Sequence, residues 1–214
     1  MNEENEFIKS LVEDAADTQP TVFDIASRSR LVILFLTVYL GLVIAVMGLR
    51  SDWYYQVTLL SYSIEMALSV ILIFFAGIAS VRFSVPRAIG RSPAVVLPFL
   101  VVVLGMVIWQ LGGVSLNALI VSVTTPSLSY ISFGVIAGAI PTASFLMWQM
   151  SQGSPTQLKF AGSLALLSAS ACGHFLMRIV GQAQSFADVL VWCYSPVIIL
   201  TMVGLMFGQK LLKW

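Results

Sequence analysis

Six long apolar stretches make up most of this chain of 214 residues. A helix needs roughly 20 apolar residues to cross about 30 Å of hydrocarbon, and each stretch is close to that length or longer. They cover residues 31–49, 57–81, 94–113, 128–150, 160–179 and 186–208. The sequence therefore predicts an all-α fold, a polytopic membrane bundle of six transmembrane helices.

The composition points the same way, because 58% of the residues are hydrophobic and only 10% are charged. A soluble domain carries about 25% charged residues. The start of the chain is acidic and lacks the basic flank and short apolar core of a cleavable signal peptide. We therefore expect the first span to remain in the protein and to direct its insertion.

The basic residues indicate which way the bundle faces. Lysine and arginine near short loops collect on the cytoplasmic side of membrane proteins. If both termini are cytoplasmic, nine of the 11 bases lie inside, and Arg50 and Arg178 remain outside. The nine are Lys9, Arg28, Arg30, Arg82, Arg87, Arg91, Lys159, Lys210 and Lys213. We therefore predict an N-in, C-in arrangement with two parts, a cytoplasmic segment over 1–30 and a transmembrane domain over 31–214.

Residues 3–17 have the pattern of a short amphipathic helix in the cytoplasm. Their apolar side chains recur at helical spacing and form a single stripe. Pro20 ends the helix, because the residue before a proline disfavours the α conformation. Residues 19–30 are expected to be an extended tether. The stripe consists of Phe7, Ile8, Leu11, Val12, Ala15 and Ala16.

This helix is too short to be stable alone in water, so its stripe needs a partner. A membrane surface is disfavoured, because anionic headgroups attract basic helices and this one is acidic. A groove on a partner protein fits better, since such grooves bind anchors at helical spacing. Packing against the protein's own cytoplasmic loops is the alternative. The candidate partner-binding residues are Phe7, Ile8, Leu11, Val12, Glu13 and Asp14.

Four ionisable residues fall within or at the edge of the predicted spans: Glu65, His174, Arg178 and Asp188. Charged groups are costly in lipid and mark candidate functional sites. The spacing predicts that His174 and Arg178 share a helix face near the outer surface. Arg178 is expected to pair with Asp188 across the short outer turn. A small transporter or channel using Glu65 and His174 is the alternative function.

The sequence offers no catalytic constellation, phosphate-binding loop or metal motif, so neither an enzyme nor a cofactor is expected. Cys172 and Cys193 lie inside predicted spans and are interpreted as packing residues. Gly134 and Gly138 form a GxxxG pattern, which allows close helix approach in lipid. This pattern serves equally for packing inside one bundle, for a homodimer, or for a structural role in a larger membrane complex.

The layout resembles the NrsF family of bacterial membrane anti-sigma factors along most of the chain. The similar parts are the N-terminal stripe with Pro20, the turns at 48–52 and 84–86, the stretch 153–162, and the end of the chain with Trp192, Gly208 and residues 211–214. Directly after Pro86, Arg87 stands where the family's turn has a glycine.

The resemblance implies a protein of the bacterial inner membrane that holds an extracytoplasmic-function sigma factor through its N-terminal segment, without direct contact to nucleic acid. Glu13 and Asp14 would then face basic surfaces of the sigma factor. The family is thought to sense oxidants through two cysteines. The corresponding positions here, near Gly181 and before Pro141, hold none. Thiol sensing is therefore not inferred.

Overall fold

The computed structural model describes residues 25–83, 97–125, 129–153, 158–181 and 185–211, and every regular element in these ranges is helical. Four helices of 23 residues form most of the bundle: α2 (Ile25–Met47), α4 (Leu60–Arg82), α7 (Ser129–Ser151) and α8 (Leu158–Val180). At 1.5 Å per residue each is about 35 Å long, which exceeds the hydrocarbon thickness.

The last long helix is interrupted near its start. It begins as α9 (Phe186–Asp188), widens into the π-helical segment η4 (Val189–Tyr194) and continues as α10 (Ser195–Leu211). A widened turn leaves carbonyl groups without their regular partners. Ser132 of α7 donates to the Trp192 carbonyl at 2.7 Å. Because the interrupted helix counts as one unit over Phe186–Gly208, five helices in the described ranges are long and apolar enough to cross a membrane.

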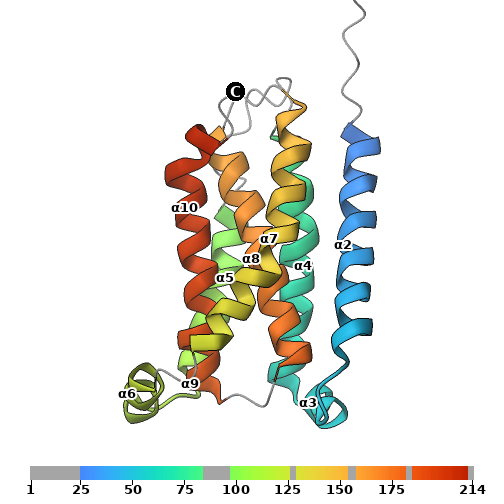
Figure 1. The fold of residues 1–214 in the computed structure, drawn as a ribbon. Coiled ribbons are helices and arrows are strands. Elements are labelled where there is room, and N and C mark those ends of the chain that lie inside the picture. Colours follow the sequence, from blue (N-terminus) through green and yellow to red (C-terminus); the bar gives the residue numbers. More distant parts are fainter. Residues whose placement is uncertain (1–24, 84–96, 126–128, 154–157, 182–184, 212–214) are drawn as a thin grey trace, which may run out of the picture.

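The third predicted span has a different form from the one expected. Helix α5 (Leu97–Leu111) is shorter than the other long helices, and the nine-residue helix α6 (Leu116–Thr124) follows it at an angle of 105°. Figure 1 shows α5 running along the bundle and α6 lying across its end. Counting this bent pair as one span gives the sixth crossing.

Two stretches outside the predicted spans are helical as well. Residues 50–56 connect the first two predicted spans, and α3 (Trp53–Thr58) occupies most of them. Helix α2 begins at Ile25, so the expectation of an extended tether over 19–30 is wrong for its last six residues. The predicted amphipathic helix over 3–17 lies outside the described residues.

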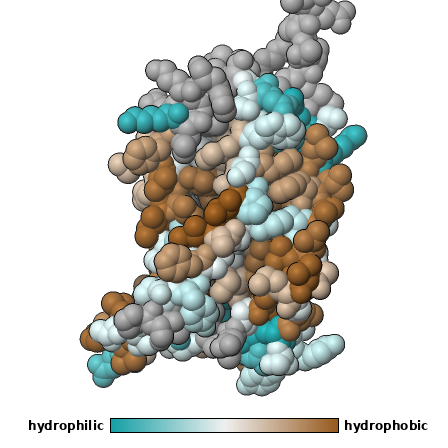
Figure 2. All heavy atoms as spheres, in the orientation of Figure 1, coloured by the Kyte–Doolittle hydropathy of each residue, from teal (hydrophilic) through white to brown (hydrophobic). Residues whose placement is uncertain are grey.

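The outer surface of the bundle matches a lipid environment. Figure 2 shows hydrophobic side chains over the middle of the face in view and hydrophilic ones toward both ends. The start of α2 and the end of α10 lie at the same end of the bundle, and α3, α6 and α9 lie at the other (Figure 1). We call these the α2-start end and the α3 end.

Helix α8 is the core of the bundle and packs against α4, α7 and α10. Small residues along it let its neighbours approach closely. Gly162 faces Gly204 and Gly208 of α10, and a Cβ on Gly162 would lie 2.9 Å from the Gly208 Cα. On another side, a Cβ on Gly173 would lie 2.0 Å from the Val135 carbonyl oxygen of α7.

The GxxxG pattern is used in this same contact. A Cβ on Gly138 would lie 3.1 Å from the Gly173 Cα, and one on Gly134 would meet the Met177 side chain at 2.3 Å. Both glycines therefore face α8 of their own chain. Of the three uses that the sequence left open, the structure supports packing inside one bundle.

Gly173→Ala is expected to lower the free energy of unfolding by about 2 kcal/mol, because the added methyl group forces α7 and α8 apart. Gly41→Ala is the matched control, since a Cβ there meets nothing within 4 Å. Thermal unfolding in detergent, followed by circular dichroism, measures both. Equal midpoints for the two variants would contradict the close α7–α8 contact.

Candidate functional site

A buried ionic cluster joins α4 to α8. Glu65 lies on α4, and His174 and Arg178 lie one turn apart on α8, so both reach the same carboxylate. Arg178 donates Nε to Glu65 Oε1 at 3.0 Å and Nη2 to Oε2 at 2.8 Å. His174 Nε2 is 3.1 Å from Oε1, within ion-pair distance but without the alignment of a hydrogen bond. We call these three residues the triad.

The three side chains of the triad are almost fully buried. The exposed fractions are 3% for Glu65, 2% for His174 and 4% for Arg178. The two parallel hydrogen bonds of an arginine–carboxylate pair are stronger than bonds between neutral groups. In this apolar environment either charge alone would be very unfavourable, so the pair holds α4 and α8 in one register.

Two polar side chains from other helices complete the surroundings of the triad. Gln110 of α5 donates Nε2 to Glu65 Oε2 at 3.2 Å. Tyr194 lies at the end of η4, and its ring centroid is 4.8 Å from that of His174. The oxygen atoms Gln110 Oε1 and Tyr194 Oη, together with His174 Nδ1, are buried without a well-aligned hydrogen bond. These three atoms around the Glu65 carboxylate could therefore each still form a hydrogen bond.

The backbone of Arg178 receives a second set of contacts. Tyr62 of α4 donates its hydroxyl to the Arg178 carbonyl at 3.0 Å, and the tyrosine ring lies 5.0 Å from the guanidinium carbon. Arg50, which follows α2, donates Nη1 to the same carbonyl at 3.4 Å and its backbone N–H to the Ile179 carbonyl at 3.0 Å. The end of α2 is thereby tied to the end of α8.

Asp52 holds the Arg50 side chain in this position. The carboxylate pairs with Arg50 Nε and accepts from Nη2 at 2.8 Å, and Gln56 Nε2 donates to it at 2.9 Å. Arg50 is 7% exposed although it follows the helix end. We call Arg50, Asp52 and the two carbonyls that Arg50 contacts the clasp. The Arg50 hydrogen bond and charge lower the pKa of Asp52 to about 2.

The predicted pair between Arg178 and Asp188 is wrong. Arg178 points to Glu65, and Asp188 forms a capping box with Ser185 at the start of α9. The Ser185 hydroxyl donates to Asp188 Oδ2 at 2.7 Å, and the Asp188 backbone N–H donates to that hydroxyl at 3.2 Å. An acidic residue in the first turn also suits the helix dipole, which explains its place there.

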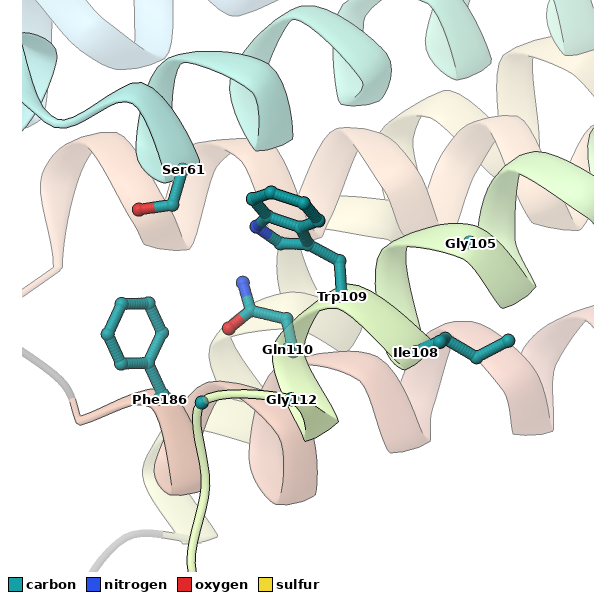
Figure 3. A pocket seen from close by; sticks show the side chains of 8 residues that line it. Ser61, Gly105, Ile108, Trp109, Gln110, Gly112 and Phe186 are labelled. Atoms are coloured by element: carbon teal, nitrogen blue, oxygen red, sulfur yellow. The ribbon is translucent and has the colours of Figure 1, made fainter.

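A pocket of about 550 Å³ opens beside the triad at the α3 end. The end of α5 and the first residues of α4 and α9 line it. Figure 3 shows the side chains of Trp109, Gln110 and Phe186 around the space, with Ser61 across from them. A second hollow of about 130 Å³ shares Gly105, Trp109 and Gln110 with it and reaches Glu65 and Tyr194.

The other residues singled out in the sequence are the two cysteines and those of the N-terminal segment. Cys172 and Cys193 are both buried and free of disulfides, as packing residues would be. Within the described ranges no group of three or more His, Cys, Asp or Glu residues could hold a metal ion. The candidate partner-binding residues of the N-terminal segment lie outside the described residues, so they stay a prediction.

Sequence reasoning missed Gln110, Tyr194 and the clasp. Gln110 is a lone amide in a strongly apolar stretch, and an intramembrane polar residue is itself a signal of function. Arg50 and Asp52 were placed in a turn outside the spans, where charged residues are common and do not indicate a functional site. Nothing in the local pattern of Tyr194 indicates a widened helical turn.

These observations define a class: a chain whose described regular elements are all helical, with long apolar helices compatible with a membrane and a buried ionic cluster between two of them. The comparison with protein families identifies it further. The family described as NrsF, negative regulator of sigma F, matches residues 11–214, and the chain belongs to this family. No curated protein and no solved structure matched the chain.

The triad predicts a strong asymmetry between single and paired substitutions. Glu65→Gln leaves Arg178 buried without its counter-charge and is expected to lower the free energy of unfolding by about 3 kcal/mol. The double variant Glu65→Leu, Arg178→Leu should lose less than Glu65→Gln alone. Asp188→Asn serves as the control and should cost less than about 1 kcal/mol, the value of a lost helix cap, because Ser185 remains as the N-cap. Chemical unfolding in detergent measures all three, and a double variant that loses as much as Glu65→Gln or more would contradict the pairing.

The clasp predicts a dependence on pH. Because folding depresses the pKa of Asp52 from 3.8 to about 2, its stabilisation is present above the ordinary value and disappears as the pH falls toward the lower one. Asp52→Asn should therefore melt below the wild type at neutral pH, with the difference closing toward pH 2. Ser51→Ala, at the exposed neighbouring residue, should show a constant difference. Melting curves across this range are the test.

Proposed function

We propose that this protein is a membrane-bound anti-sigma factor that holds an extracytoplasmic-function sigma factor at the cytoplasmic face of the bacterial inner membrane. The description of its family, negative regulator of sigma F, implies a sigma factor as the partner. The single observation that carries the mechanism is the acidic, amphipathic segment at the start of the chain. It is the largest hydrophilic stretch of the sequence.

The apolar stripe of this segment is the proposed docking surface. Phe7, Ile8, Leu11 and Val12 are anchors at helical spacing, which suits a groove on a folded partner. Glu13 and Asp14 lie on the polar side and would complement basic surfaces of the sigma factor. Such charges contribute to association rate and specificity more than to affinity.

The position of the segment supports an anchoring role for the bundle. Eight residues separate Ala16, the last residue of the stripe, from α2, which begins at Ile25. Arg28 in the first turn of α2 donates Nη1 to Gln149 Oε1 of α7 at 2.8 Å. A sigma factor bound to the segment would therefore stay close to a fixed point of the bundle and away from RNA polymerase.

The alternative of a small transporter or channel has less support. A pathway needs ionisable or polar groups along the depth of the membrane, and Glu65 is 3% exposed and bonded to Arg178 and Gln110. The other charged residues of the described helices lie in their first two or last turns. Glu65 is one buried carboxylate whose charge Arg178 neutralises. Such a pair is typical of a structural or regulatory contact and not of a pathway across the membrane.

Leu11→Glu is expected to derepress the sigma-dependent genes, because it places a charge in the middle of the apolar stripe. Deletion of residues 1–20 should have the same effect. Transcription from a sigma-dependent reporter measures both, and the amount of protein in the membrane fraction shows that the bundle still inserts. Glu4→Gln, on the polar side of the same helix, is the matched control and should leave repression intact.

A pull-down with residues 1–30 as bait identifies the partner directly. Recovery of a sigma factor with the wild-type segment and its loss with Leu11→Glu is the expected result. Full repression by the deletion variant, at wild-type levels in the membrane, would refute the proposal.

A further inference from the structure

The pocket at the α3 end has the composition of a ligand site rather than of a gap between helices. Its volume of about 550 Å³ lies within the usual range for small-molecule sites. Trp109 and Phe186 provide aromatic surface, and Gly112 and Gly113 leave room where side chains would fill it. None of the described residues that line it is charged. The ligand that suits these walls is apolar or aromatic and neutral.

One polar group on the wall has a fixed orientation. Gln110 donates Nε2 to Glu65 Oε2, and Glu65 is itself held by Arg178. The amide cannot flip without losing this bond to a carboxylate, because its oxygen would then face negative charge. Oε1 therefore stays on the other side of the amide. Figure 3 shows the Gln110 side chain directed into the space between Trp109 and Phe186.

That oxygen is an acceptor without a partner. Gln110 is 2% exposed, and Oε1 makes no hydrogen bond within the described structure. Burying a polar group without a hydrogen bond costs free energy, and a ligand that supplies a donor recovers it. An acyl chain of a membrane lipid would fill the pocket but leave the oxygen unpaired. A ligand with a donor is therefore favoured over lipid.

We propose that this pocket binds a small neutral molecule of the phenol class, with its hydroxyl donating to Gln110 Oε1 and its ring between Trp109 and Phe186. Aromatic rings favour offset or edge-to-face contacts with one another, which the two side chains offer. A cation is disfavoured, because Arg178 already neutralises Glu65 behind the amide. The inference concerns binding by the bundle and does not depend on the identity of the sigma factor.

A ligand bound at this site would be linked to the triad through Gln110, which contacts Glu65. Gln110 belongs both to the pocket and to the smaller hollow that reaches Glu65 and Tyr194. A hydroxyl bonded to Oε1 polarises the amide and strengthens its bond to the carboxylate. The site is therefore placed to report a membrane-soluble molecule to the contact between α4 and α8.

The test uses the full chain in lipid nanodiscs with two matched probes, para-octylphenol and para-octylanisole. The anisole has the same ring and tail but no donor. Tryptophan fluorescence follows binding, and Trp109→Phe and Trp148→Phe separate the signals, because Trp109 lines the pocket and Trp148 does not. The phenol is expected to change the signal saturably in the wild type and in Trp148→Phe, but not in Trp109→Phe.

The affinities decide the proposal. The anisole should bind about tenfold more weakly than the phenol, which corresponds to one hydrogen bond. Gln110→Leu should weaken the phenol by a similar factor and leave the anisole unchanged. Equal binding of the two probes in the wild type would overturn the proposal and identify the pocket as a groove for lipid chains.

A second variant covers the case in which Gln110→Leu fails to fold. A Cβ on Gly105 meets nothing within 4 Å, so Gly105→Leu adds a side chain to open space at the wall of the pocket. It should abolish binding of both probes. Gly41→Leu adds the same side chain to an open position on α2 and should bind both normally. Unchanged phenol binding in Gly105→Leu would also overturn the proposal.

Discussion

The ion pair between Glu65 and Arg178 is the interaction on which the arrangement of the α3 end depends. Two charges that are each less than 5% exposed must find one another, because neither is tolerated alone in an apolar interior. Their pairing sets α4 against α8. It also fixes the end of α8, where the Arg178 carbonyl accepts from Tyr62 and Arg50. The loop after α2 and the start of α4 are thereby placed around one residue.

Helix α8 can hold this position because it is made largely of small residues. Its neighbours approach it at backbone distance on two sides, at Gly162 and at Gly173. Most of the helix is buried, whereas α2 has a broad exposed apolar face and few buried side chains. In lipid, such close packing replaces the hydrophobic effect as the source of helix association. The molecule thus has a tightly packed centre and a peripheral first helix.

The pattern of apolar stretches was sufficient to predict the five long helices, but not the short helices, the connections or the partners of each helix. Hydropathy reports composition, so it could not detect the 105° bend between α5 and α6 or the helical start at Ile25. The shared face of His174 and Arg178 followed from their spacing. Their partner did not, because Glu65 is 113 residues from Arg178 and Asp188 is much closer along the chain. Sequence distance favoured the wrong carboxylate, and only the packing of α4 against α8 identifies the right one.

The peripheral helix is also the one that leads directly to the proposed sigma-binding segment. A continuous set of contacts runs from Gln110 through Glu65 and Arg178 to the clasp at the end of α2. Helix α2 then spans the bundle and meets α7 through Tyr39, whose hydroxyl donates to the Gly138 carbonyl at 2.9 Å, and through Arg28 with Gln149. A change in the α4–α8 contact would therefore reach α2 at the clasp, where its end has polar anchors. Helix α2 buries Val32, Leu36 and Leu40, far fewer side chains than α8, so a shift passed through the clasp and along α2 would break fewer contacts than a shift of α8.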